Sequence, residues 1–372
     1  MSQGFTSSVF FELVRAGLWG KVVQLSPYGD IDFSEIRKLA EEQSVVGLVA
    51  AGLEHVEDHK PGKKDVLPFI GQALQLEQRN SAMNDFIGGL YDKMRAEGIY
   101  ALLVKGQGVA QCYERPLWRS AGDIDFLLSK DCLAKALALL SPFAQHVDRE
   151  ESYSRHIGMT IEQWTVELHG SLRGGLSFRM DKVIDEIQTD CFRGGNVRCW
   201  KDGETDVSLP GADNDILFIF THFLKHFYRG GIGLRQICDW CRLLWTFRSE
   251  IDVTLLERRL KSMGLVSEWK AFGAFAVYYL GMPVEAMPLY SSDIKWNRKA
   301  NRICTFVLEV GSFGHNRDMS YYEKYPFLIR KVISMGWRIG DLLRHARIFP
   351  LDSLRFFPKI MFDGVRSAVK GE

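Results

Sequence analysis

Two aspartates separated by a single residue, Asp123 and Asp125, form the tripeptide of this chain with the clearest chemical meaning. In a β-strand, residues two apart project to the same face, so the two carboxylates would stand side by side while Ile124 enters the core. Like charges at this distance repel each other, and a divalent cation removes the conflict. Because Mg²⁺ prefers carboxylate oxygens together with substrate phosphates, the pattern predicts a site for Mg²⁺, or for Mn²⁺ in its place.

A third acidic residue lies further along, in a segment whose polar and apolar residues alternate, Trp164–His169. The alternation predicts a strand on which Glu167 and His169 share one face. Phosphoryl-type transfer with two cations usually calls for a third carboxylate, so Asp123, Asp125 and Glu167 are the predicted catalytic and metal-binding residues. An ordinary solvated glutamate is the alternative for Glu167. His169 is either the acceptor of a hydroxyl proton or a hydrogen-bonded structural histidine.

A glycine turn upstream supplies groups that could hold phosphates. The apolar run 100–104 predicts a buried strand, which ends at Lys105 and Gly106. A glycine lets phosphate oxygens approach the backbone, and amides at a helix N-terminus can hold them. Arg119 could neutralise phosphate charge together with Lys105. The predicted nucleotide-binding residues are Lys105, Gly106, Gln107, Arg119, His169 and Lys225.

A predicted helix after residue 210 carries four polar residues on one face: His222, Lys225, His226 and Arg229. This face either borders the same cleft, touching nucleotide or acceptor, or is merely solvated. A zinc site of the metalloprotease type is disfavoured because no glutamate follows His222. Arg235 and Asp239, which are four residues apart, are interpreted as an ion pair on a helix surface.

The overall composition excludes several classes of protein. With 47 basic and 46 acidic residues, the chain has no general signature of nucleic-acid binding. The N-terminus lacks a basic start followed by a long apolar run, so no signal peptide is expected, and no uncharged run is long enough to span a bilayer. We therefore expect a cytoplasmic protein without a membrane partner. The seven cysteines are scattered, and the pair Cys238 and Cys241 lies inside an apolar helical pattern. Reduced thiols are therefore expected, rather than a metal or redox centre.

The periodicity of the apolar residues, which predicts the elements that position these side chains, changes twice along the chain. Helical periodicity dominates up to residue 96 and returns after residue 210, whereas strands and helices are mixed between them. The pattern predicts an α+β fold, with a small mixed-sheet core flanked by helical domains. The expected divisions are an N-terminal helical region (1–96), a core (97–209) and a C-terminal helical domain (210–372). The expected core elements are strands at 100–104 and around 123–128, a helix at 131–140, and a hairpin of His156–Ile161 with Trp164–His169.

The order of these motifs resembles a bacterial family often labelled uncharacterised nucleotidyltransferase, within the DNA polymerase β-type superfamily. The shared pattern is Lys-Gly after a strand, Tyr and Arg before the acidic pair, Asp-Ile-Asp followed by aliphatic residues, and an acidic-Leu-His further on. These positions are occupied by Lys105, Gly106, Tyr113, Arg119, Asp123, Asp125, Glu167 and His169. One departure concerns the usual Gly-Ser pair, which here is Gly106-Gln107, so the serine hydroxyl expected to touch the β- and γ-phosphates is missing.

The resemblance implies a function that the residues alone do not specify. A Mg²⁺-dependent nucleotidyltransferase would move a nucleoside monophosphate, with AMP from ATP as the expected case, onto an unidentified acceptor. The implied partners are a nucleoside triphosphate and a small molecule, tRNA or protein as acceptor. Because fold and function are separable, the alternative is a catalytically inactive nucleotide- or partner-binding protein that retains the fold.

Overall fold

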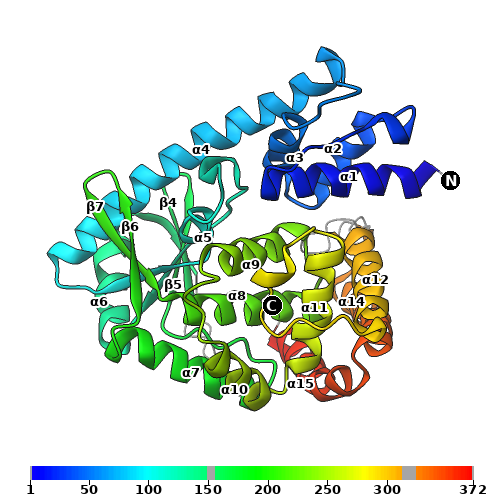
Figure 1. Ribbon diagram of the computed structural model, residues 1–372. Helices are drawn as coiled ribbons and strands as arrows, with labels where there is room; N and C mark the ends of the chain where they lie inside the picture. The colour runs from blue at the N-terminus through cyan, green and yellow to red at the C-terminus, as the bar shows by residue number, and fades with distance from the viewer. Residues whose placement is uncertain (1, 149–155, 312–323, 371–372) are drawn as a thin grey trace.

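A computed structural model describes residues 2–148, 156–311 and 324–370 and combines many α-helices with a mixed five-stranded sheet and a separate two-stranded sheet (Figure 1). The predicted α+β class is therefore confirmed. No helix in the described ranges combines the length and the apolar character needed to cross a membrane.

Three N-terminal helices form a small layer: α1 (Ser2–Trp19), α2 (Phe33–Glu42) and α3 (Val46–Leu53). Asp32 caps α2, because its carboxylate accepts hydrogen bonds from the first backbone amides of the helix. A fourth helix, α4 (Lys63–Ala96), runs from this layer to the sheet as one unbroken element (Figure 1).

The five-stranded sheet has the order β1-β2-β5-β4-β3, from strands β1 (Ala101–Val104), β2 (Ile124–Leu128), β3 (Ala144–Val147), β4 (His156–Ile161) and β5 (Trp164–His169). β2 and β5 pair in parallel, and the other neighbours are antiparallel. The hairpin of β4 and β5 has the bounds expected from sequence. A helix of five residues, α5 (Gly106–Ala110), follows β1, and α6 (Lys130–Leu140) follows β2.

Alternation along the strands divides the core in two. Side chains such as Phe126 and Leu168 pack against the second half of α4 and against α6. Side chains on the other face, such as Leu127, belong to the larger cluster, which joins the N-terminal helices and the helices of the C-terminal half. Polar residues that share the face of Leu127 must therefore point toward those helices.

Several elements of the core are absent from the sequence-based description. These are the strand β3, the helix α7 (Phe178–Arg193), and the hairpin of β6 (Val197–Asp202) with β7 (Thr205–Pro210). The predicted boundary at residue 96 coincides with the end of α4, yet side chains of α4 from Met83 onward pack on the sheet. The boundary at residue 209 lies one residue before the end of β7. The division into three domains stays a prediction.

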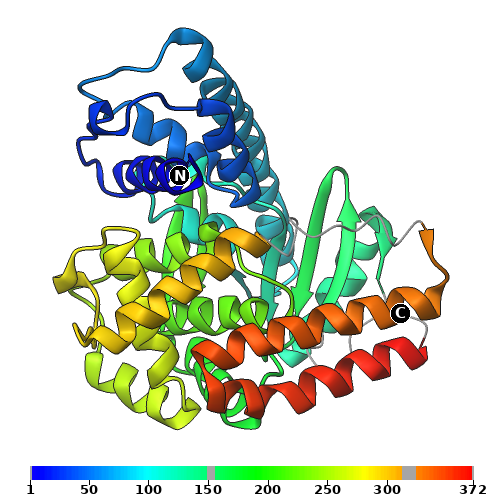
Figure 2. The same ribbon diagram turned by 90° about the vertical axis from the view of Figure 1, so that its right-hand side faces the viewer.

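The C-terminal half is helical: α8 (Ala212–Arg229), α9 (Leu234–Thr246), α10 (Val253–Met263), α11 (Val266–Tyr278), α12 (Ile294–Val310), α14 (Phe327–Ile348) and α15 (Pro350–Lys370). Aromatic rings such as Phe220, Trp240 and Trp269 contact one another at its centre. These rings are core residues and do not form a surface for stacking bases. The last two helices lie side by side (Figure 2).

Candidate active site

Parallel pairing of β2 with β5 brings the three predicted carboxylates together. Asp125 lies opposite Glu167 in the register, and Asp123 directly precedes β2. One oxygen from each of the three side chains lies within 4.8 Å of the others. Because Val166 and Leu168 pack under α4 and α6, the alternation along β5 turns Glu167 to the opposite face, toward α7 and α8.

Asp125 is the most buried member of the cluster, with 1% of its surface exposed. Its Oδ1 lies 2.6 Å from Nζ of Lys105 and 2.7 Å from Nε2 of His169. Its Oδ2 is buried and has no hydrogen-bond partner among the described residues. An unsatisfied buried carboxylate oxygen costs free energy, and a cation bound there would remove that cost. Three carboxylates that converge in this way fit Mg²⁺ or Mn²⁺.

Lys105 reaches Asp125 through an unusual backbone conformation. Its φ of 61° and ψ of −150° lie in a region that residues with a side chain rarely adopt. Gly106 follows with φ of 40°, which is a conformation suited to glycine. Burial alone would lower the pKa of Lys105, but the carboxylates of Asp125 and Asp123 outweigh it, and the pKa is raised. The amine therefore stays charged beside the carboxylates.

The repulsion expected within the acidic pair shows in the raised pKa of Asp123. The negative charge of Asp125, followed by burial, raises the pKa of Asp123, and Lys105 offsets only part of this effect. Asp123 has no ion pair among those found in the described residues, whereas Asp125 has two. The two aspartates therefore differ in their surroundings although they look equivalent in the sequence.

Glu167 is held by two histidines. Its Oε2 lies 3.1 Å from Nε2 of His156 and 3.2 Å from Nε2 of His169. The two imidazole rings stack, with centroids 4.7 Å apart and planes at 15°. Burial acts to raise the pKa of Glu167, but hydrogen bonds from His156 and His169 and the charge of Lys105 together lower it. Glu167 therefore stays ionised.

A cavity of about 340 Å³ opens beside the carboxylates. Its wall comprises the turn after β1, the residues around β2 and β5, and parts of α7, α8 and α9. Of the predicted polar face of α8, His222, Lys225 and His226 line the cavity. Arg229 lies outside this lining, and its Nη2 donates to the carbonyl of Gly175 at 3.3 Å.

The two histidines of α8 are neutral at physiological pH. Their Nε2 atoms lie 3.1 Å apart. Burial and the charges of Lys225 and Lys105 lower the pKa of His226 to about 3, and burial with the charge of Lys105 likewise lowers that of His222. They offer hydrogen bonds to the cavity without adding charge. In the described part of the chain, neither belongs to a cluster of three potential metal ligands.

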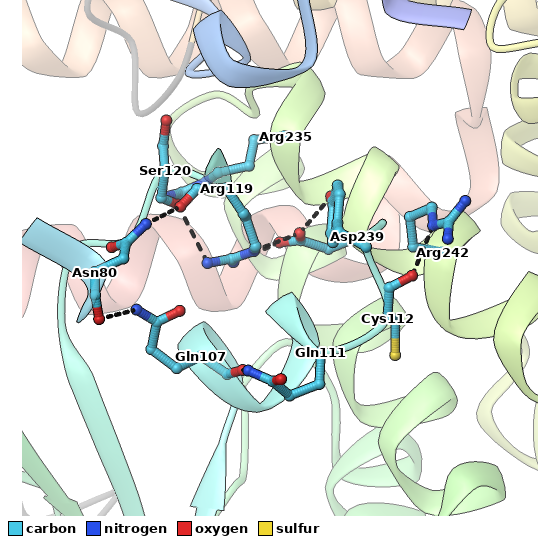
Figure 3. Close-up of polar contacts among 10 residues, drawn as sticks. Asn80, Gln107, Gln111, Cys112, Arg119, Ser120, Arg235, Asp239 and Arg242 are labelled. Carbon is cyan, nitrogen blue, oxygen red and sulfur yellow. Dashed lines mark hydrogen bonds and ion pairs between the residues drawn. The ribbon is translucent and has the colours of Figure 1, made fainter. Parts of the chain in front are cut away.

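Arg119 and Asp239 form a buried ion pair in the cavity wall (Figure 3). Nε and Nη2 of Arg119 each lie 2.7 Å from a different carboxylate oxygen of Asp239. Arg235 instead donates to the carbonyl of Ser120 at 2.7 Å. The prediction of a surface pair between Arg235 and Asp239 is therefore wrong, because α9 turns this face inward, where Asp239 is only 5% exposed. Arg119, expected to neutralise phosphate, has its charge matched by Asp239.

Gln107 is placed differently from expectation. Its side chain is 2% exposed and lies outside the lining of the cavity. It faces α4, where Nε2 lies 3.5 Å from the carbonyl oxygen of Asn80 (Figure 3). The side chain therefore belongs to the core beside α4, and the assignment of Gln107 to nucleotide binding stays a prediction.

The CxxC pair is also part of the core. Cys238 and Cys241 are both buried in α9, and burial raises the pKa of each thiol. Protonated thiols are poor metal ligands and poor nucleophiles. This agrees with the expectation of structural cysteines.

His156 is the residue of the cluster that the sequence-based prediction missed. A signal for it exists: the hairpin turns at Glu162 and Gln163, so strand pairing places residue 156 opposite residue 169. Pairing of His156 with His169 could therefore have been derived from the hairpin bounds alone. The approach of both rings to Glu167 could not, because it depends on side-chain rotamers.

A family model described as uncharacterised nucleotidyltransferase matches residues 29–281, which is more than half of the chain and includes the sheet and the cavity. Among solved structures, an antigenic nucleotidyltransferase-like protein from Paracoccidioides brasiliensis matches 54% of this chain and 93% of its own, with 13% sequence identity and a TM-score of 0.32. No curated protein matches the chain.

Proposed function

Since the chain belongs to the uncharacterised nucleotidyltransferase family, we propose that it transfers a nucleoside monophosphate, expected to be AMP from ATP, to an acceptor in a Mg²⁺-dependent reaction. The observation that carries the proposal is the convergence of Asp123, Asp125 and Glu167 on one cavity. The buried, unpartnered Oδ2 of Asp125 supports it, because a cation would satisfy that oxygen.

The reaction requires a new bond between the acceptor oxygen and the α-phosphorus, while the bond to the bridging oxygen breaks, pyrophosphate leaves and the proton of an acceptor hydroxyl passes to solvent. Bound cations would supply charge stabilisation at the attacking and leaving oxygens. His169 Nε2 lies within hydrogen-bond distance of two carboxylate oxygens, so this nitrogen is already engaged by Asp125 and Glu167. We therefore assign His169 to positioning Asp125 and Glu167, and not to general-base catalysis.

Residues around the cavity suggest how a triphosphate would be oriented. Lys105 and Lys225 both line the cavity and suit the phosphates. The neutral pair His222 and His226 suits the uncharged sugar or base, to which it can offer hydrogen bonds. Because the charge of Arg119 is matched by Asp239, we propose that Arg119 holds the loop before Asp123 in place.

The proposal is tested by pyrophosphate release and by the shift in melting temperature with Mg²⁺ and each of the four nucleoside triphosphates. We expect Mg²⁺-dependent binding and turnover for at least one of them. Asp123→Asn should lower turnover on the order of a thousandfold and abolish most of the shift, because it removes a charge that holds the cation. Asp131→Asn is the matched control, since Asp131 is exposed in α6 and outside the cavity.

One result would exclude the enzyme. If the wild-type protein shows neither Mg²⁺-dependent binding nor turnover with any of the four nucleotides, the chain is a non-catalytic member of the family that retains the fold.

A further inference from the structure

A second group of potential ligands lies next to the three carboxylates. It consists of His156, Glu167 and His169, whose ligand atoms all lie within 4.8 Å of one another. Two of its members come from β5, and the third lies directly opposite on β4. The strands therefore fix the spacing, because His156 and His169 are paired in the register and stack ring on ring. Only Glu167 is shared with the aspartate pair.

The distance of each histidine nitrogen from Glu167 matches the ligand spacing around a small divalent ion. Nε2 of each histidine lies 3.1 or 3.2 Å from Oε2 of Glu167. When metal–ligand bonds are ~2.1 Å long, adjacent ligand atoms of a tetrahedron or octahedron are ~3.0–3.4 Å apart. The two nitrogen–oxygen separations therefore already suit a bound cation, and a small rotation of the stacked imidazole planes would turn both Nε2 atoms toward it.

We propose that His156, Glu167 and His169 form a second cation subsite, which binds a transition-metal ion of the Zn²⁺ type in preference to Mg²⁺. Imidazole nitrogen favours Zn²⁺ and its neighbours in the first transition row, whereas Mg²⁺ takes oxygen ligands. Three protein ligands facing a cavity leave a coordination position open, as in zinc sites that bind water or substrate oxygen. That position would accept an oxygen of the acceptor or of a phosphate.

The local charge is favourable for a second dication. Asp123, Asp125 and Glu167 bring three negative charges, against the one positive charge of Lys105. Lys105 pairs with Asp125 Oδ1, the same oxygen that His169 Nε2 approaches, so the cluster keeps a net negative charge beside the imidazoles. The competing explanation is a purely structural one, in which the histidines only hold Glu167 in place.

Metal binding without nucleotide separates the two explanations. Chelator-treated protein is titrated with Zn²⁺ against a chromophoric chelator, and with Co²⁺ followed by visible absorption. We expect tight binding of Zn²⁺ and Co²⁺ by the wild type and weak binding of Mg²⁺. His156→Ala and His169→Ala should each weaken Zn²⁺ binding by ~10-fold or more. His146→Ala is the matched control, because His146 lies on the same sheet beside Asp148 and is 71% exposed.

Two further variants keep the test decisive. His156→Gln retains a hydrogen-bond donor for Glu167, so the variant should keep the melting temperature of the wild type. It should nevertheless lose the affinity for Zn²⁺, because the imidazole ligand is gone. An unchanged Zn²⁺ affinity of this variant would overturn the proposal. Asp123→Asn should leave Zn²⁺ binding nearly unchanged, because Asp123 belongs only to the carboxylate site. Absence of Zn²⁺ binding by the wild type would refute the second subsite, whereas the proposed transfer reaction would still stand on its own Mg²⁺-dependent test.

Discussion

Asp123 and Asp125 respond to different forces, and their substitution should therefore have opposite effects on stability. Asp123→Asn removes a charge that its neighbour repels, since Asp125 and burial raise the pKa of Asp123. Without metal, we expect its melting temperature to be equal to or above that of the wild type. Asp125→Asn leaves Lys105 buried without its ion pair, so we expect a loss on the order of 2 kcal/mol.

The comparison is made by thermal and urea unfolding in the presence of a chelator. The double variant Asp125→Asn with Lys105→Met removes both partners of the ion pair and should recover part of the stability. Equal destabilisation by the two single substitutions would contradict the difference in surroundings seen in the structure.

Residue spacing was enough to find the carboxylates but not their partners. Two aspartates two apart and an alternating strand with Glu167 are local patterns, and periodicity assigns their faces. The ion pair of Arg119 with Asp239 joins positions 120 residues apart, so it depends on how α9 packs on the loop before β2. Sequence reasoning instead joined Asp239 to Arg235, because helical spacing is the only relation visible without tertiary structure.

At the scale of elements, the crossing of α1 and α3 depends on glycines. A Cβ atom at Gly52 would lie 2.0 Å from the carbonyl oxygen of Leu13, and one at Gly17 would lie 2.0 Å from that of Leu48. The two helix backbones are therefore in direct contact. Gly52→Ala should force them apart and destabilise the protein by about 3 kcal/mol, as measured by urea unfolding.

Gly71→Ala provides a matched control with the opposite sign. Gly71 is exposed within α4, and an added Cβ would meet no atom within 4 Å. Alanine there should stabilise the protein by roughly 0.5–1 kcal/mol through helix propensity. A neutral effect of Gly52→Ala would show that the two helices can separate without cost.

Elements with clear periodicity were predicted well, and the others were missed for physical reasons. The hairpin of β4 and β5 alternates polar and apolar residues, and its bounds agree with the structure. β3 is an edge strand whose residues are mostly exposed, so it has no alternation to detect. β6 likewise has a single fully buried residue, Trp200. Packing against other elements, rather than local pattern, fixes such strands.

At the scale of the whole molecule, the family match ends at residue 281, and the last helices dock on the part that it covers. A buried carboxyl of the matched part, that of Glu268, lies next to the last helix. Glu268 in α11 is fully buried, and its Oε1 accepts a hydrogen bond from Tyr228 of α8 at 3.0 Å. Burial, with the neighbouring carboxyl of Asp352 in α15, raises the pKa of Glu268 from 4.5 to about 8. The acid is thus mostly protonated at neutral pH.

This raised pKa makes the docking of α15 sensitive to pH. The folded protein binds the proton of Glu268 more tightly than the unfolded chain does, so the associated stability is fully present below about pH 4.5 and is lost as the pH rises through about 8. Glu268→Gln keeps the uncharged form at all pH values. The stability of this variant relative to the wild type should increase between these two pH values by on the order of a few kcal/mol.

Urea unfolding at several pH values measures the difference in stability. Glu257→Gln is the control, because Glu257 forms an exposed ion pair with Lys261 and its substitution should change stability only slightly. A constant difference between Glu268→Gln and the wild type across this range would mean that Glu268 is not buried against α15 in solution.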